Sequence, residues 1–174
     1  MSKPDNRISV IALDTTPLGK IWLAYSGEGL AAVEVGGSLD ELKKYIPPKY
    51  KISSVISHEG IHQAAVQIEE YLEGKRRAFD LPIDWSGTTD FQRMVLGAVD
   101  SIPYGETRSY GQIAAKIGKP KASRAVGRAN ATNPIPLVIP CHRVIGSDGH
   151  LRGYGAGEGI ETKAWLLDLE KRTS

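Results

Sequence analysis

A cysteine, a histidine and an arginine are consecutive in the segment Pro140-Cys141-His142-Arg143, and Cys141 is the only cysteine of the chain. A thiol beside a base or a positive charge has more thiolate character than an isolated thiol, and the thiolate is the reactive nucleophile. The segment therefore favours nucleophilic chemistry at Cys141. The alternative is that Cys141 is a small buried hydrophobic residue, as many solitary cysteines are.

The residues before Cys141 predict a stiff arm. The run from Asn133 to Pro140 contains three prolines and is otherwise mostly apolar. Each proline fixes its own φ and disfavours helical geometry in the residue before it. We therefore expect a rigid, mostly buried segment that ends at the thiol.

Length and composition limit the class of protein. The 174 residues suffice for one large domain or two small ones that fold unaided. One cysteine excludes an intramolecular disulfide and fits a reducing compartment. The polar first residues lack the apolar core of a signal peptide, and no apolar run is long enough to span a bilayer. We expect a cytoplasmic protein that does not insert into membranes.

The net charge of +2 is unevenly distributed. Residues 1–100 carry 11 basic and 14 acidic residues, a net of −3, whereas residues 101–174 carry 11 and 6, a net of +5. A basic stripe is typical of proteins that bind a phosphate backbone, although a solvated basic face is the alternative. Between residues 105 and 143, Glu106 is accompanied by seven basic residues: Arg108, Lys116, Lys119, Lys121, Arg124, Arg128 and Arg143.

The pattern of apolar residues predicts an α+β protein, with a small domain over residues 1–84 built on an antiparallel sheet and a mostly helical domain over residues 85–174. His58 and His62 are four residues apart, but no further ligand accompanies them, so we predict no metal. The segment Leu81–Thr89 reads as a linker. In the first domain, strands are expected at Ile8–Leu13, Lys20–Tyr25, Leu30–Val35 and Lys51–Ser57, and helices at Leu39–Tyr45 and Ile61–Glu73.

The second domain contains a predicted helix-turn-helix. A first helix runs from Thr89 or Asp90 to about Ile102, and two short helices follow at Tyr110–Ile117 and Lys121–Ala131. The last of these is rich in Ala and Gly, whereas reading base edges in the major groove favours Asn, Gln or several Arg. Small residues favour close approach to the minor groove, with an arginine inserted between bases. Ordinary helix packing through alanines is the alternative.

The C-terminal part is expected to hold a hairpin, a loop and a helix. Val144–Leu151 reads as a hairpin that turns at Ser147-Asp148-Gly149. The glycine-rich loop Arg152–Gly159 does not follow the dinucleotide or phosphate-loop pattern, so its glycines suggest flexibility or close approach to a ligand. A final helix is expected at Thr162–Lys171.

Several of these motifs together resemble one family. Pro140-Cys-His-Arg-Val144, preceded by Asn133-Pro and Arg124-Ala-Val-Gly and followed by Gly153-Tyr and the ending Leu-Leu-x-x-Glu170, closely resembles the O6-alkylguanine-DNA alkyltransferases, also called methylated-DNA–protein-cysteine methyltransferases. The resemblance is dense from Asp90 to Glu170 and looser before. It implies a winged-helix-like second domain, and a monomer that needs no cofactor. The implied activity is repair of double-stranded DNA: an O6-alkylguanine is flipped out through the minor groove, and its alkyl group is transferred irreversibly to Cys141.

The resemblance also implies a role for each site residue. His142 would accept the thiol proton through a water and Glu170 would orient the imidazole, in the manner of a catalytic triad. Tyr110 would assist flipping and donate to guanine N3, and Asn133 would brace the arm through backbone bonds. The implied DNA-binding residues are Lys121, Ala122, Ser123, Arg128 and Arg124, which replaces the extruded base, and the implied pocket is lined by Tyr110, Pro136, Val144, Tyr154 and Gly155.

The chain departs from the family pattern in its C-terminal loop. Gly155 stands where many members carry serine, and residues 155–160 are about two residues longer than in close family patterns. This insertion leaves Glu161 and Asp168 as alternatives to Glu170. The cysteines with which some relatives bind zinc are missing, so no metal is inferred.

Three other functions compete with this reading. An alkyltransferase-like binder would recognise damaged guanine without transfer, but such proteins lack the cysteine. A winged-helix transcription factor is disfavoured by a helix that offers no sequence readout. A cysteine hydrolase would need an oxyanion hole and a substrate groove that the sequence does not reveal.

Overall fold

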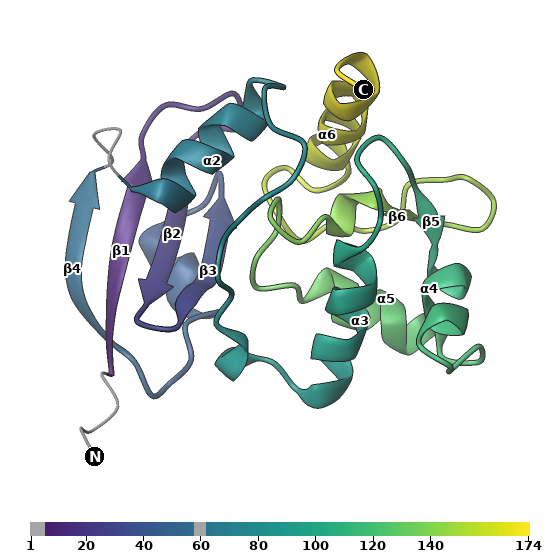
Figure 1. The fold of residues 1–174 in the computed structure, drawn as a ribbon, viewed down its shortest axis with the longest axis horizontal. Coiled ribbons are helices and arrows are strands. Elements are labelled where there is room, and N and C mark those ends of the chain that lie inside the picture. Colours follow the sequence, from purple (N-terminus) through teal and green to yellow (C-terminus); the bar gives the residue numbers. More distant parts are fainter. Residues whose placement is uncertain (1–5, 58–61) are drawn as a thin grey trace.

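The computed structural model describes residues 6–57 and 62–174, which form a sheet-based first half and a helical second half (Figure 1). The first half contains β1 (Arg7–Leu13), β2 (Ile21–Ser26), β3 (Gly29–Val35), α1 (Leu39–Lys43), β4 (Lys51–Ser57) and α2 (Gln63–Leu72). The second half contains α3 (Asp90–Asp100), β5 (Arg108–Ser109), α4 (Tyr110–Lys116), α5 (Ser123–Ala131), β6 (Val144–Ile145) and α6 (Ile160–Arg172), with short 3-10 turns at η1 (Trp85–Gly87) and η2 (Cys141–Arg143). The α+β class is confirmed.

The sheet has the strand order β3-β2-β1-β4 and is mixed. β1 pairs with β2, and β2 with β3, in antiparallel directions, as the short turns between them require. β4 pairs with β1 in the parallel direction, so the prediction of a purely antiparallel sheet was wrong. The reason is the connection through α1, which carries the chain across the sheet and returns it beside β1 at the end where β1 begins.

One helix covers each face of the sheet. α1 begins with a capping box between Ser38 and Glu41, and its Leu42 packs with the strand residues of one face. α2 packs on the other face through Ala65, Ile68 and Leu72. That second face shares one continuous apolar core with the helical half, in which Val99 of α3 and Leu166 of α6 are fully buried. The two halves are therefore joined by apolar packing.

In the second half, α4 and α5 pack against each other as a helix-turn-helix, with α3 behind them. α4 starts with a capping box between Ser109 and Gln112. Of the predicted hairpin over Val144–Leu151, the turn at Ser147-Asp148-Gly149 is present, but its two paired strands are not. β6 pairs in parallel with β5, far back in the chain, and the residues after β6 form a turn closed by a hydrogen bond from Gly146 N to His150 O.

The outer edge of β3 is covered by three segments that come from farther along the chain. The amide of Leu30 donates to Pro82 O and that of Asp84 to Leu30 O, so the predicted linker is attached to the sheet. Val33 N donates to Pro134 O of the proline arm at 2.8 Å, and Gly157 N of the glycine-rich loop donates to Val35 O at 3.0 Å. The edge of the first half thus positions two segments of the second.

The expectations about membranes and metals can be compared with the structure. Among the described residues, no helix is both long and apolar enough to cross a membrane. The described residues also contain no group of three or more His, Cys, Asp or Glu side chains that could hold a metal ion. His62 caps α2 by accepting a hydrogen bond from Ala64 N, whereas His58 lies outside the described residues.

Candidate active site

The proline arm is braced from within by Asn133. The Asn133 amide nitrogen donates to Ile139 O at 3.0 Å, and its oxygen accepts from Ile135 N at 2.9 Å. Leu137, between them, has a φ of 72°, a left-handed conformation that a non-glycine residue rarely adopts. The side chain of Asn133 therefore helps to fix an unusual turn just before the cysteine.

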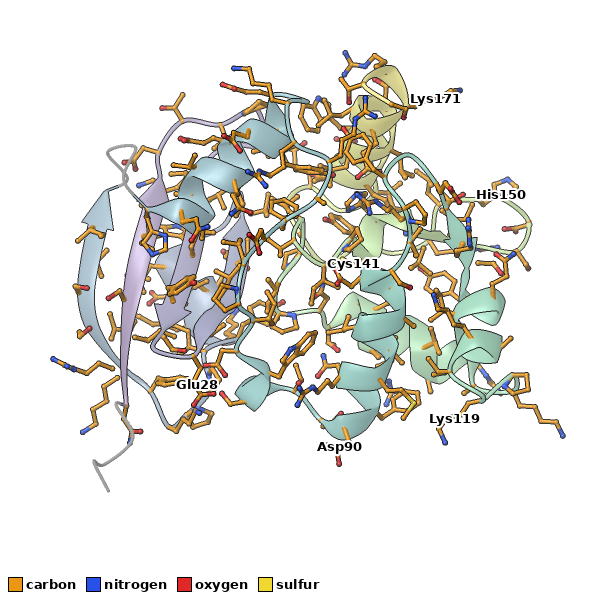
Figure 2. All side chains as sticks on the ribbon, in the orientation of Figure 1. Glu28, Asp90, Lys119, Cys141, His150 and Lys171 are labelled. Atoms are coloured by element: carbon orange, nitrogen blue, oxygen red, sulfur yellow. The ribbon has the colours of Figure 1, made fainter. Side chains whose placement is uncertain are left out.

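Cys141 lies at the end of this arm, in the interior of the molecule (Figure 2). It begins the turn η2 and is 3% exposed. Its amide donates to Ile139 O at 2.7 Å, and its carbonyl oxygen accepts from the side chain of Asn130 at 3.2 Å. The thiol lines a small cavity of about 10 Å³ whose walls include Asn133, Pro136 and Gly155.

Glu170 is the point at which the buried polar groups converge. One carboxylate oxygen, Oε1, lies 2.7 Å from His142 Nε2 and accepts the Tyr71 hydroxyl at 2.6 Å. The Arg143 guanidinium donates to both oxygens, and Gly105 N donates to Oε2 at 3.0 Å. Glu170 and His142 are 0% exposed, whereas the alternatives Glu161 and Asp168 are exposed.

These contacts determine which groups are ionised. Burial alone would raise the pKa of Glu170, but hydrogen bonds from His142, Arg143 and Tyr71 lower it to about 2. Burial lowers the pKa of His142, and the positive charges of Arg143 and Lys163 lower it further, against the opposing effect of Glu170. At neutral pH, the site thus contains an ionised carboxylate and a neutral imidazole. Within the part of the chain that the structure describes, His142 Nδ1 is buried without a hydrogen-bond partner.

The Cys141 thiol is protonated in this environment. Burial raises its pKa, and interactions with Asn133, Lys163 and Tyr154 counteract only part of that effect. The Tyr154 hydroxyl is buried near the sulfur but makes no hydrogen bond of regular geometry with any described residue. A thiol held in this form needs a base before it can attack.

Lys163 is a buried cation close to the thiol. Its side chain is 0% exposed, and its Nζ donates to Val144 O at 2.6 Å and to Arg152 O at 3.0 Å. Burial lowers its pKa to about 8, and attraction to the ionised form of Cys141 opposes that shift. Nζ also lies 6.0 Å from the centre of the Tyr110 ring. The lysine thus ties the glycine-rich loop to the strand after the cysteine.

A surface cleft of about 510 Å³ opens beside this interior site, lined by Tyr110 of α4, Ser123 and Arg124 of α5, and Arg152 and Gly153 of the glycine-rich loop. Tyr110 stands at the first position of α4, directly after its cap Ser109. Burial raises its pKa, and the ionised form of Cys141 would raise it further, so the hydroxyl keeps its proton. Ala131 lines both this cleft and the small cavity at Cys141.

The predicted DNA-binding residues lie at or near α5 and differ in exposure. Lys121, Arg124 and Arg128 are exposed, and Ala122 and Ser123 are partly buried. Arg124 borders both the 510 Å³ cleft and a second cleft of about 440 Å³ that includes Arg128. Arg143, counted in the basic stripe, is instead buried against Glu170 and Ile102 O, so it is not part of the exposed basic surface.

The structure brings together nearly all of the predicted site and adds two residues. Asn133, Gly155 and Tyr154 lie at Cys141, His142 pairs with Glu170, and Tyr110 lines the cleft. Sequence reasoning missed Tyr71 and Lys163. Lys163 could have been found, because Lys163, Leu166 and Glu170 recur at helical spacing on the buried face of α6.

The fold and the site define a class of protein: a helix-turn-helix protein whose buried thiol is backed by a histidine and a carboxylate. Residues 10–85 match the family described as 6-O-methylguanine DNA methyltransferase, ribonuclease-like domain, and residues 90–172 match its DNA binding domain. Together these matches span most of the chain. The chain belongs to the 6-O-methylguanine DNA methyltransferase family.

Individual relatives agree with this assignment. The chain is 45% identical over 159 residues to the methylated-DNA–protein-cysteine methyltransferase of Methanosarcina acetivorans, covering 91% of this chain and 96% of the relative. It is 42% identical over 160 residues to the inducible enzyme of Bacillus subtilis, covering 89% and 88%. A crystal structure of Mycobacterium tuberculosis OGT in complex with DNA superposes with a TM-score of 0.76 at 40% identity, covering 95% of this chain and 94% of that one.

Proposed function

We propose that the chain repairs DNA by transferring an alkyl group from the O6 atom of guanine to the sulfur of Cys141. The family and the relatives named above support this reaction, and the observation that carries it is a buried thiol beside a neutral imidazole and an ionised carboxylate. The sulfur–carbon bond forms as the O6–carbon bond breaks. Because the thioether is stable, each molecule acts once.

Activation of the thiol follows from the site geometry. The Cys141 proton passes through a bridging water to His142, whose Nδ1 has no hydrogen-bond partner among the described residues. The resulting imidazolium is stabilised by Glu170, 2.7 Å from Nε2. A thiolate is a soft nucleophile and suits attack at a saturated carbon better than a hydroxyl.

The leaving guanine acquires negative charge, which a donor must compensate. Tyr110 is suited to this because its hydroxyl remains protonated and the residue lines the cleft. The backbone of the loop after Tyr154 passes close to Ala131, which also lines the cleft. These groups stabilise the departing base.

The damaged base reaches this site only by leaving the DNA stack. Arg124 stands on the rim of the cleft, on a helix whose small residues permit close approach to the minor groove. Its side chain takes the place of the extruded base, while Lys121, Ser123 and Arg128 contact the backbone. A monomeric state and a cytoplasmic location remain predictions from the sequence.

Intact-protein mass provides the test. The protein is mixed with a duplex oligonucleotide that contains O6-methylguanine, alongside a Cys141→Ala variant. We expect a stoichiometric gain of one methyl group in the protein and none in the variant. DNA binding with no change of mass would reject the transfer reaction and indicate a protein that only recognises damage.

A further inference from the structure

Tyr71 belongs to α2 of the first half, but its hydroxyl reaches the catalytic pair of the second half. Tyr71 Oη lies 2.6 Å from Glu170 Oε1 and 3.1 Å from His142 Nε2, and those two atoms are 2.7 Å apart. The tyrosine is 0% exposed. The three polar atoms therefore form a closed triangle that excludes solvent, with one corner supplied by the other half of the molecule.

The protons of this triangle can be assigned from its chemistry. The Glu170 carboxylate is ionised and can only accept hydrogen bonds. Burial and the charge of Glu170 raise the pKa of Tyr71 well above its ordinary value, so the phenol keeps its proton and donates it to Glu170. A neutral imidazole between two such oxygens carries its proton on Nε2. The unprotonated nitrogen is then Nδ1, the atom without a described partner.

We propose that Tyr71 is a positioning residue for alkyl transfer, which holds His142 as the Nε2–H tautomer and keeps the imidazole neutral so that Nδ1 can take the Cys141 proton. This inference rests on the proposed function. Tyr71 acts by sharing Glu170 Oε1 with His142. Its hydrogen bond reduces the negative charge density on Oε1. This weakens the attraction that would otherwise favour protonation of the imidazole.

Removal of the hydroxyl has two opposing effects on His142. Glu170 would lose a donor at 2.6 Å and attract a proton on His142 more strongly, whereas Nε2 would lose a second acceptor at 3.1 Å. The shorter bond involves a charged group, and such bonds are the stronger ones. The first effect therefore dominates, and loss of the hydroxyl favours the protonated imidazolium.

Other charged and titratable groups near the pair remain in place when only this hydroxyl is removed. Arg143 and Lys163 both lower the pKa of His142, and Asp100 on α3 faces Arg143. The remaining neighbours are Cys141, Tyr104 and Tyr154.

The test compares Tyr71→Phe with a matched Tyr104→Phe control. The Tyr104 ring packs edge-on against Tyr71, 6.2 Å between centroids, and its hydroxyl is 2.6 Å from Thr173 Oγ1 at the end of α6. Each variant thus removes one hydroxyl from this pair of packed rings, and each hydroxyl contacts the C-terminal segment. Only the hydroxyl of Tyr71 contacts the catalytic groups His142 and Glu170. Thermal melts establish that each variant folds.

Two readouts separate a positioning role from a structural one. In nitrogen-15 NMR of the unmodified protein, His142 should be the Nε2–H tautomer, and its titration should move to higher pH in Tyr71→Phe but not in Tyr104→Phe. The rate of reaction with free O6-benzylguanine near neutral pH should fall about 2- to 10-fold in Tyr71→Phe, the range that one hydrogen bond supplies. The acidic limb of its pH–rate profile should move in the same direction.

Distinct results would overturn this inference and the proposed function. An Nδ1–H tautomer in the unmodified protein would refute the role of Tyr71 without any variant. Superimposable pH profiles of Tyr71→Phe and the unmodified protein would also refute it, while leaving alkyl transfer intact. Failure of the unmodified protein to gain mass from methylated DNA would instead reject the proposed function.

Discussion

At the residue scale, Glu170 connects the chemistry of the site to its stability. Its carboxylate accepts from His142, Arg143, Tyr71 and Gly105 in a buried environment. A buried charge that loses its counter-charge is costly, because the remaining ion has neither partner nor water. Glu170 therefore both orients the imidazole of His142 and neutralises the buried Arg143.

We predict that Glu170→Gln lowers the free energy of unfolding by about 3 to 5 kcal/mol, because Arg143 is left uncompensated. Urea denaturation at neutral pH measures it. Asp168→Asn is the control, since Asp168 is exposed on the same helix and its ion pair with Arg172 is at the surface. That variant should change stability by about 0.5 kcal/mol or less. Equal losses would show that the buried pair has no special importance.

The difference in unfolding free energy between the unmodified protein and Glu170→Gln should depend on pH with a definite sign. The folded-state pKa of Glu170, about 2, lies below its ordinary value of 4.5. Its stabilisation is thus complete above pH 4.5 and is lost as the pH falls toward 2. The stability gap between the unmodified protein and Glu170→Gln should narrow over that window. A gap that stays constant would mean that Glu170 is not ionised in the fold.

At the scale of elements, the loop after Tyr154 approaches the end of α5 more closely than a side chain permits. A Cβ placed on Gly155 would lie 2.7 Å from Ala131 O, whereas one on Gly153 would meet nothing within 4 Å. A residue with a side chain at this position therefore does not fit this backbone without movement. The same loop reaches the edge of β3 through Gly157.

We predict that Gly155→Ala destabilises the protein by about 1 to 3 kcal/mol, the cost of inserting an atom where packing is already closed. Gly153→Ala, two residues away, should have a much smaller effect. Thermal and urea unfolding of both variants measure the difference. Similar values for the two would show that the loop moves away from α5 at little cost.

The helix α5 carries the prediction for base flipping. Arg124→Ala should greatly reduce repair of O6-methylguanine in duplex DNA and leave the reaction with free O6-benzylguanine nearly unchanged, because the free base needs no extrusion. Arg172→Ala removes the same charge from the exposed end of α6 and serves as control. Single-turnover rates on both substrates measure the effect. Equal losses on the two substrates would refute the flipping role.

Alternation and helical spacing predicted most elements of the fold, because they report which face of an element is buried. Ser38, Thr89 and Ser109 cap their helices, in agreement with the preference of Ser and Thr for N-cap positions. The direction of β4 was not predictable, since a strand's own residues do not encode its partner. Likewise, Val144–Ile145 pairs with Arg108–Ser109, a contact that local turn signals cannot reveal.

The site residues that belong to a recognisable sequence motif were predictable. Cys141 and His142 are adjacent in the chain, and Glu170 was placed by resemblance to a family. Tyr71 was not predictable, because a tyrosine on the apolar face of α2 is indistinguishable from an ordinary core residue until the two halves are brought together. The buried position of Arg143 also depended on tertiary structure, because its partners Glu170 and Ile102 O are far from it in the sequence.

At the scale of the whole molecule, the two halves carry opposite net charges but share one apolar core. The first half is net acidic and buries Tyr71 against the catalytic pair, and the second half carries the excess of positive charge. The helices α4 and α5 lie on the side away from the sheet (Figure 1). They and the turn between them carry five exposed basic residues: Lys116, Lys119, Lys121, Arg124 and Arg128. This arrangement orients the molecule toward DNA and keeps the acidic half away from the phosphates.

The charge distribution predicts how DNA binding depends on salt. Each phosphate contact releases counterions, so the logarithm of the binding constant falls linearly with the logarithm of salt concentration, by about 0.9 per contact on duplex DNA. Arg128→Ala should reduce the magnitude of that slope by about 0.9, because Arg128 is exposed on α5. Lys75→Ala, which removes an exposed charge from the first half, should leave it unchanged.

Fluorescence anisotropy with a labelled duplex, over a series of salt concentrations, measures these slopes. Sequence preference should be weak, because phosphate contacts carry no base information. A slope that Lys75→Ala changes as much as Arg128→Ala would mean that overall charge governs binding. A slope that neither variant changes would place the phosphate contacts elsewhere on the second half, with Lys119 and Lys121 in the turn before α5 as the next residues to replace.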